Sequence, residues 1–430
     1  MMITPNNIPQ GYKATPLGII PQEWEVKFLG DLLSRCANGL TYDVSITSGI
    51  PVTRIETIST GEINYAKVGY ITNESGYEIF RMQKGDILYS HINSLSQIGK
   101  VAYYKGDKEI YHGMNLLLLR ANESLDKQYL YYTLLTDYMR HMAQVIAKPA
   151  VNQASISTSD LKRVKIAVPP LAEQRKIAEV LGVWDRAIEK QSQLIEQLTL
   201  RKRGLMQQLL TAKRRLPGFS DPWKKVRLGD IGKFDKGFGV PKESIKENGN
   251  KAITYGEIYT KYNYVIKNVA SYIDDETASI SKKITRGTIL FTGSGETLED
   301  IGKCVAFIDN DVAYAGGDII IFNPSIEINR VVLSYCLNSS PVNAQKWKYG
   351  QGFSVVHIYQ KDLAKIQIEI PSFEEQTAIA QVLTAADREI ELAQQKLELL
   401  RQQKRGLMQQ LLTGKKRVNH GHKTTTMQSN

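Results

Sequence analysis

One ten-residue segment occurs twice in this chain, unchanged and 202 residues apart. KRGLMQQLLT runs from Lys202 to Thr211 and again from Lys404 to Thr413. The similarity extends upstream: between Pro169 and Thr211, 24 of 43 positions are identical to the residues 202 further on, without a gap. Such an internal duplication dictates architecture, because each copy is expected to form the same structural unit. The chain is therefore predicted to consist of two related halves.

Each copy is predicted to form one long helix with an apolar seam. Prolines close the segment before it, at residues 169–170 and at Pro371. Beyond them, the seam positions recur at alternating intervals of four and three residues, which is the a/d pattern of a coiled coil. The seam contains Ile177, Leu181, Trp184, Ile188, Gln191, Ile195, Leu198, Lys202, Leu205 and Leu209 in the first copy, and Ile379, Leu383, Ala386, Ile390, Ala393, Leu397, Leu400, Lys404, Leu407 and Leu411 in the second. Two such helices in one chain are expected to pair with each other.

The segments before the two helices repeat as well, although more loosely. GDILYS (85–90) is echoed by GTILFT (287–292), and each is followed by an Ile-Gly-Lys step. Short runs of this kind, bounded by glycine turns and accompanied by one helical stretch, are typical of compact α+β domains of about 150 residues. The predicted organisation is a first head at 1–168, a helix at 169–213, a second head at 214–370, a helix at 371–415 and a disordered basic and polar tail at 416–430.

The formal net charge of +11 comes largely from one stretch. Between Arg201 and Arg227 lie nine basic residues and a single acidic one. A basic chain without a membrane segment most often meets nucleic acid. Phosphate or partner contacts are expected from Arg214, Arg215, Lys224 and Lys225. The alternative is a solvated helix end whose charges interact favourably with the helix dipole.

Other features favour a cytoplasmic protein. No run approaches the roughly 18 apolar residues of a membrane span, and the N-terminal segment MMITPNNIPQ lacks the basic start and apolar region of a secretory signal. Cys36, Cys304 and Cys336 lie far apart without metal-ligand spacing. This suits a reducing compartment better than a disulfide framework or a zinc site.

Five segments together identify a family. IPQEWEVKFLGDL and DPWKKVRLGDI precede the heads, PPLAEQRKIAEVL and PSFEEQTAIAQVL open the helices, and KRGLMQQLLT closes each helix. From about residue 17 to 417, the chain resembles the specificity (S) subunits of type I DNA restriction-modification enzymes. The resemblance implies two target-recognition domains joined by two antiparallel coiled-coil helices, with a pseudo-twofold internal repeat. Each domain would read one half of a bipartite, asymmetric site in double-stranded DNA.

The resemblance further implies a non-catalytic chain that docks methyltransferase (M) subunits, two of them, and restriction/translocase (R) subunits. S-adenosylmethionine, ATP and Mg would be used by those partners, and no cofactor or metal by this chain. The helix residues expected to serve pairing or subunit docking are Ile177, Leu181, Trp184, Ile188, Leu198, Leu205, Ile379, Leu383, Ile390, Leu397 and Leu407.

Catalytic motifs are near misses. A DNA amino-methyltransferase needs a D/N-P-P-Y/F loop, but Asn323-Pro324 is followed by Ser325. A phosphate-binding loop needs GxxxxGK[ST], whereas GETLEDIGKC has six residues between its glycines and ends in cysteine. These mismatches argue against one alternative, a stand-alone enzyme that modifies or cuts DNA. Another alternative, a coiled-coil scaffold without a nucleic-acid role, predicts no retention on duplex DNA and is disfavoured by the basic cluster.

Base reading is expected from the loops after GDILYS and GTILFT, because short polar side chains on loops supply donors and acceptors for base edges. The first-rank candidates are Ser90, His91, Asn93 and Ser94 in head one, and Thr292, Gly293, Ser294 and Glu296 in head two. The second-rank candidates are Lys148, Asn152 and Gln153, with Lys346, Lys348 and Gln351 in head two. An ordinary polar turn is the alternative in each case.

Overall fold

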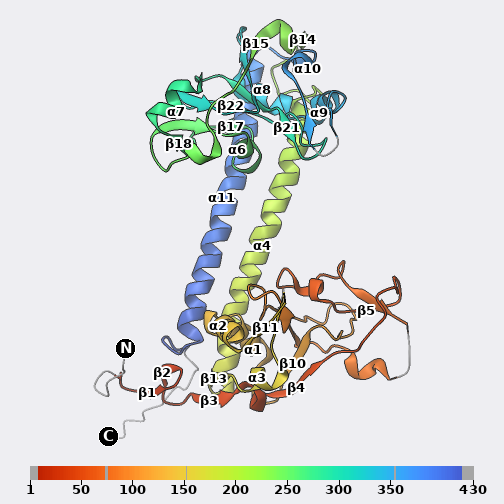
Figure 1. Cartoon of the computed structure of the whole chain (residues 1–430), viewed down its shortest axis with the longest axis vertical. Helices are drawn as coiled ribbons and strands as arrows, with labels where there is room; N and C mark the ends of the chain where they lie inside the picture. Colours follow the sequence, from red (N-terminus) through yellow and green to blue (C-terminus); the bar gives the residue numbers. More distant parts are fainter. Residues whose placement is uncertain (1–7, 73–75, 152, 353–354, 419–430) are drawn as a thin grey trace. The chain divides into compact units, whose positions relative to one another are not determined.

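The structure, a computed structural model, describes residues 8–72, 76–151, 153–352 and 355–418. Contacts divide the chain into a first unit, Met1–Gln191 with Lys396–Asn430, and a second unit, Ser192–Gln395. Two helices of 39 residues, α4 (Leu171–Leu209) and α11 (Phe373–Leu411), each contribute one part to either unit (Figure 1). Of the predicted tail, residues 419–430 lie outside the described residues.

The first head is built around a four-stranded antiparallel sheet in the order β4-β10-β7-β9. Its central strands are buried throughout most of their length, which explains why their sequences are continuous apolar runs rather than alternating ones. The strands of this sheet are β4 (Leu33–Asn38), β10 (Leu117–Ala121), β7 (Ile87–Tyr89) and β9 (Val101–Tyr103). The smaller sheets are formed by β1 (Tyr12–Thr15) with β2 (Gly18–Pro21), β3 (Glu25–Phe28) with β13 (Lys165–Val168), β5 (Ile50–Val52) with β6 (Gly69–Ile71), and β11 (Lys148–Ala150) with β12 (Gln153–Ser155) and β8 (Ile92–Asn93). The α-helices are α1 (Lys127–Leu134), α2 (Asp137–Ile146) and α3 (Thr158–Lys162).

The second head repeats this sheet order as β15-β24-β20-β22 and adds β17 at the edge. These strands are β15 (Gly232–Lys236), β24 (Ile319–Pro324), β20 (Ile289–Thr292), β22 (Cys304–Phe307) and β17 (Val265–Ile266). The other sheets are β18 (Ser271–Ile273), β16 (Asn250–Ile253), β23 (Ala313–Ala315) and β19 (Lys282–Ile284); β14 (Lys224–Arg227) with β26 (Gln367–Ile370); and β21 (Ser294–Gly295) with β25 (Val356–His357). The α-helices are α5 (Leu228–Ile231), α6 (Tyr255–Thr260), α7 (Asp275–Ile280), α8 (Arg330–Leu337), α9 (Ser340–Trp347) and α10 (Gln360–Leu363). The prediction of two related α+β heads is confirmed.

A Glu-Gln pair lies in the first turn of each long helix, and its glutamine forms a hydrogen bond to the head that precedes the helix. Gln174 Oε1 accepts a hydrogen bond of 2.7 Å from the N–H of Asp126, the residue that caps α1. Gln376 Oε1 accepts one of the same length from the N–H of Asn329, which caps α8. The same contact therefore sets where α1 in head one and α8 in head two begin relative to the long helix.

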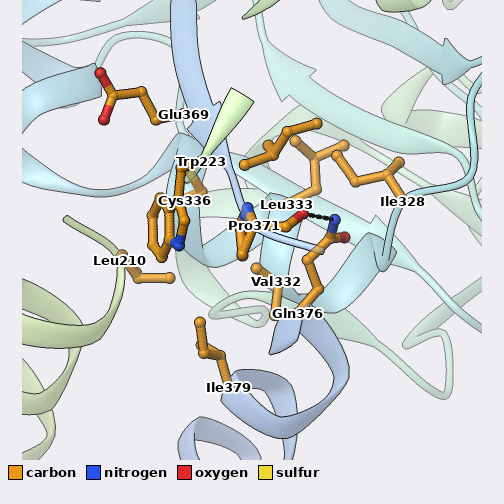
Figure 2. Close-up of a pocket in the computed structure, with 11 residues that line it drawn as sticks. Leu210, Trp223, Ile328, Val332, Leu333, Cys336, Glu369, Pro371, Gln376 and Ile379 are labelled. Atoms are coloured by element: carbon orange, nitrogen blue, oxygen red, sulfur yellow. Dashed lines mark hydrogen bonds between the residues drawn. The ribbon is translucent and has the colours of Figure 1, made fainter. Parts of the chain in front are cut away.

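The glutamate of each pair is buried and neutralised by an arginine. In the second unit, Arg215 donates from Nε and Nη2 to Glu375 at 2.6 and 2.7 Å, and Trp223 Nε1 donates to the same carboxylate at 3.2 Å. Trp223 and Ile379 both line a small cavity at the start of α11 (Figure 2). The cavity left there is about 10 Å³, the lower limit for one water, so the contact is close-packed.

Within each unit, the parts of α4 and α11 run in opposite directions. In the first unit Lys404 donates to Asp185, and Arg417, beyond the end of α11, donates to Glu173 near the start of α4. In the second unit, Lys202 pairs with Asp387, and Arg215 with Glu375 in the same opposed order. All the predicted seam positions are buried or half-buried. The finer statement that the helices form a coiled coil remains a prediction.

None of the helices in the described part of the chain combines the length and the apolar content that a membrane crossing needs.

Candidate nucleic-acid interface

A small sheet in head one brings the first-rank and second-rank candidates together. β8, which follows the GDILYS strand, pairs with β12 so that Asn93 stands opposite Ala154. β12 in turn pairs with β11, with Lys148 opposite Ser155. Candidates about 60 residues apart in the sequence are thus carried by one sheet. Asn152 lies outside the described residues.

The side chains of this set differ in how accessible they are. Ser94, Lys148 and Gln153 are exposed, whereas Ser90 and His91 are only 1% and 5% exposed. Burial lowers the pKa of His91, and its Nδ1 has no hydrogen-bond partner among the described residues. Side chains so deeply buried cannot reach a base edge as they stand, so the expectation that Ser90 and His91 read bases does not fit this structure.

Head two repeats the arrangement on β21 and β25. Ser294 stands opposite His357 on the sheet, and Gln351 forms an isolated bridge with His357. Glu296, Lys348 and Gln351 are exposed. The candidates of head two are therefore also brought together by two paired strands, β21 before α8 and β25 after α9 in the sequence.

Two candidates of head two are structural. Thr292 is fully buried and receives a hydrogen bond of 2.7 Å from the hydroxyl of Tyr259. Lys346 is 1% exposed, and its Nζ donates to the carbonyl of Gly302 at 2.7 Å. Burial lowers the pKa of Lys346 to about 8. A DNA contact by Lys346 does not fit this conformation, because its ammonium group donates to a backbone carbonyl inside the head.

The residues of the basic cluster also differ in how accessible they are. Arg214, Lys224 and Lys225 are exposed, the two lysines on β14, which pairs with β26. Arg215 instead donates two hydrogen bonds to the buried Glu375, which raises its pKa, and a third to the carbonyl of Asp221 at 3.0 Å. Its guanidinium is occupied by a structural ion pair, so the prediction of a phosphate contact for Arg215 does not fit the structure.

A hollow of about 540 Å³ opens beside Gly293 and Ser294 in head two. We call it the head-two hollow; its lining residues are Lys236, Gly293, Ser294, Asp318, Ile319, Ile320, His357, Ile358, Tyr359, Gln360 and Lys361. Lys236, His357, Tyr359 and Lys361 were not among the residues predicted from the sequence. The repeat contained a signal for His357, because it lies 202 residues after Ser155, on the strand that pairs with a first-rank loop.

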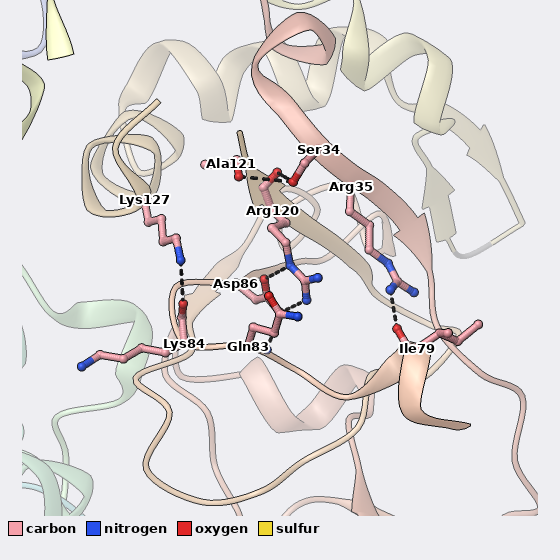
Figure 3. Close-up of polar contacts among 9 residues, drawn as sticks. All are labelled: Ser34, Arg35, Ile79, Gln83, Lys84, Asp86, Arg120, Ala121 and Lys127. Carbon is pink, nitrogen blue, oxygen red and sulfur yellow. Dashed lines mark hydrogen bonds and ion pairs between the residues drawn. The ribbon is translucent and has the colours of Figure 1, made fainter. Parts of the chain in front are cut away.

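One buried ion pair of head one has been replaced in head two. Asp86, which is 1% exposed, receives two hydrogen bonds of 2.7 Å from Arg120 (Figure 3). In head two, Thr288 Oγ1 donates to Asn323 Oδ1 at 3.0 Å between the equivalent strands. The shared frame therefore tolerates different polar pairs at one position.

Among the described residues, no group of three His, Cys, Asp or Glu side chains is arranged to hold a metal ion.

Comparison with known proteins agrees with this architecture. Residues 21–200 and 220–402 each match the type I restriction modification DNA specificity domain. A putative type I restriction enzyme specificity subunit, MjaX of Methanocaldococcus jannaschii, is 35% identical over 95% of this chain and 97% of its own length.

Two solved structures share the fold. The type I restriction-modification S subunit of M. genitalium superposes with a TM-score of 0.55 at 17% identity, covering 90% of this chain and 96% of its own. A chain from a study of complex assembly and conformational transition in a type I restriction-modification system gives 0.58 at 16% identity, covering 92% and 99%. The two matched domains and the 35% identical relative together show that this chain belongs to the family of type I restriction-modification DNA specificity subunits.

Proposed function

We propose that the chain is the non-catalytic subunit that gives a type I restriction-modification complex its DNA sequence specificity. Head one would bind one half of a bipartite, asymmetric site in double-stranded DNA, and head two would bind the other. The observation that carries this proposal is the repeated frame with different side chains. β8–β12 and β21–β25 occupy equivalent places in the two heads, but Ile92 and Ser155 of the first are Ser294 and His357 in the second.

Exposed basic residues support contact with the DNA backbone. Arg214, Lys224, Lys225, Lys148 and Lys348 are all exposed, and lysine and arginine provide the phosphate contacts that position a protein on a duplex without reading its sequence. The polar side chains Asn93, Ser94, Gln153, Glu296 and Gln351 have the donors and acceptors that base edges require.

The long helices are proposed to dock the partner subunits. A solved relative comes from a study of complex assembly in such a system. Apolar side chains such as Val183, Leu194, Leu200, Leu392 and Leu399 are 43% to 55% exposed on α4 and α11. Two methyltransferase subunits and the restriction/translocase subunits would bind there, and S-adenosylmethionine, ATP and Mg would be used by those subunits.

The decisive experiment is co-expression with a type I methyltransferase subunit from the same source, followed by genome-wide mapping of methylated adenines. A bipartite consensus is the expected result. Exchanging residues 17–160 for the corresponding head of a relative should then change one half of the consensus and leave the other half unchanged. Methylation without a consensus, or a change in both halves, would contradict the proposal.

A further inference from the structure

One cross-strand residue pair of the small sheet, here called a rung, differs chemically between the two heads. Ser294 on β21 stands opposite His357 on β25, and Ser294 Oγ lies 2.9 Å from His357 Nδ1. The equivalent rung of head one joins Ile92 to Ser155. The apolar Ile92 thus corresponds to the hydroxyl-bearing Ser294, and the hydroxyl-bearing Ser155 corresponds to the imidazole of His357.

The backbone around this rung is the same in both heads. The N–H of Ile358 donates to the carbonyl of Gly293 at 3.0 Å, and the N–H of Ile156 donates to that of His91 at 2.8 Å. Because the main-chain contacts coincide, the difference between the rungs lies in the side chains. A position whose frame is kept while its side chains change is where two heads can read different sequences.

Ser294 fixes the direction in which the imidazole of His357 points. His357 is half-buried and lines the head-two hollow. Its Nδ1 is engaged by Ser294, and within the described residues its Nε2 has no hydrogen-bond partner. A serine hydroxyl can donate or accept, so Nε2 is either a donor or an acceptor according to the tautomer. A ring held in this way can make one directional hydrogen bond.

The rim of the hollow has the charges that a nucleic acid requires. Lys236 and Lys361 are exposed and, among the described residues, neither makes an ion pair. Tyr359 is 49% exposed, and Lys361 Nζ lies 5.8 Å from the centre of its ring. Asp318, also exposed, lies directly before β24 and adds a carboxylate acceptor to the lining. Two unpaired cations beside a fixed hydrogen-bonding group match phosphates flanking a base edge.

We propose that the head-two hollow receives the edge of one base pair of the second half-site, with His357 Nε2 as the group that selects the base. Lys236 and Lys361 contact the flanking phosphates, and Ser294 is a positioning residue that acts through His357. This assignment rests on the proposed function and deepens it by naming the specificity-determining residue of head two.

The test uses the full chain assembled with its methyltransferase subunits. We would compare the parent with His357→Ala, Ser294→Ala and Lys361→Ala, using Ser155→Ala on the equivalent rung of head one as the matched control. The measurements are the methylated consensus and the salt dependence of binding to duplex DNA. His357→Ala should relax one position of one half-site by about tenfold, and Ser294→Ala should relax the same position less. Lys361→Ala should keep the consensus and lower the salt slope by about one.

The outcomes separate the two proposals. A parent complex that yields no bipartite consensus contradicts the proposed function itself. If the parent yields one and the His357→Ala complex keeps every position, the proposed function stands and the role of His357 is overturned. Should His357→Ala fail to assemble, His357→Phe keeps an aromatic ring at the site but removes both ring nitrogens. An altered base preference at one position supports the proposal, and an unchanged consensus overturns it. The Ser155→Ala control should leave the second half-site unchanged, and relaxation of the position assigned to His357 would overturn the assignment.

Discussion

Arg417 donates from Nε and Nη2 to the buried carboxylate of Glu173, at 2.6 and 2.9 Å. The two residues are 244 positions apart, so this ion pair joins the end of the described chain to the start of α4. Trp24 Nε1 adds a third hydrogen bond of 3.0 Å to the same carboxylate. The second unit contains the equivalent ion pair between Arg215 and Glu375. The cluster is therefore part of the duplicated frame, and it stabilises each unit independently of DNA.

Replacing Arg417 with alanine should destabilise the first unit. The change leaves a carboxylate that is 0% exposed without its cation, although the indole of Trp24 still donates to it. Removing one partner of a buried ion pair costs about 3 kcal/mol or more in the free energy of unfolding. Urea unfolding followed by tryptophan fluorescence would measure it.

Lys416→Ala is the matched control for this prediction. Lys416 is adjacent and exposed, and its replacement removes the same charge without breaking the ion pair. Its free energy of unfolding should stay within about 0.5 kcal/mol of the parent's. Equal losses from both substitutions would show that Arg417 contributes as a surface charge rather than through Glu173.

The repeat in the sequence predicted which residues have equivalent places in the two halves, but not which residues they form ion pairs with. Glu173 and Glu375 lie in the repeated segment, and Arg215 and Arg417 are separated by the same 202 residues. The sequence prediction nevertheless placed Arg215 on DNA. Local charge counting cannot reveal that a carboxylate 160 residues away neutralises one member of a basic cluster.

Buried polar residues were the other source of error. Thr292 and Lys346 have the composition of a binding loop, yet their partners come from α6 and from the loop before β22. The sequence held a hint for Lys346, because the apolar Val342 precedes it by four residues and so shares its helical face. By contrast, the seam of α4 and α11 was predictable, since its period depends on helix geometry alone.

The hydroxyl of Tyr132 in head one forms a hydrogen bond to α4. Tyr132 donates from its hydroxyl to Asp185 at 2.6 Å, and Lys404 donates to the other oxygen of that carboxylate. Tyr132→Phe should lower the free energy of unfolding by about 2 kcal/mol, because it removes a hydrogen bond to a charged group. Tyr131→Phe is the control, since the hydroxyl of Tyr131 makes no hydrogen bond within the described residues. Thermal unfolding of both variants would decide; equal shifts would contradict the specific role of Tyr132.

The pair Asp86 and Arg120 should show strong energetic coupling. Arg120→Asn alone leaves a carboxylate that is 1% exposed without its cation, at a cost of about 3 kcal/mol or more. Asp86→Thr alone leaves a guanidinium that can still reach water, because the side chain of Arg120 is 21% exposed. The double variant reproduces the Thr288 and Asn323 pair of head two and should recover most of the loss.

A double-mutant cycle in urea measures this coupling. A double variant as unstable as the sum of the two single variants would show that head one does not accept the polar pair of head two.

The first unit should also lose stability at mildly acidic pH because of His112. This side chain is 0% exposed, its Nε2 lies 2.9 Å from the carbonyl of Leu116, and burial lowers its pKa to about 4. An unfolded histidine titrates near 6.5, so between pH 6.5 and 4 the unfolded chain binds more protons than the folded chain. The stabilisation is fully present above pH 6.5 and is lost as the pH falls to 4, by about 3 kcal/mol in total. His112→Gln should flatten the pH dependence of urea unfolding in that window, while His141→Gln at an exposed position should not. A parent slope that survives His112→Gln would assign the effect to other groups.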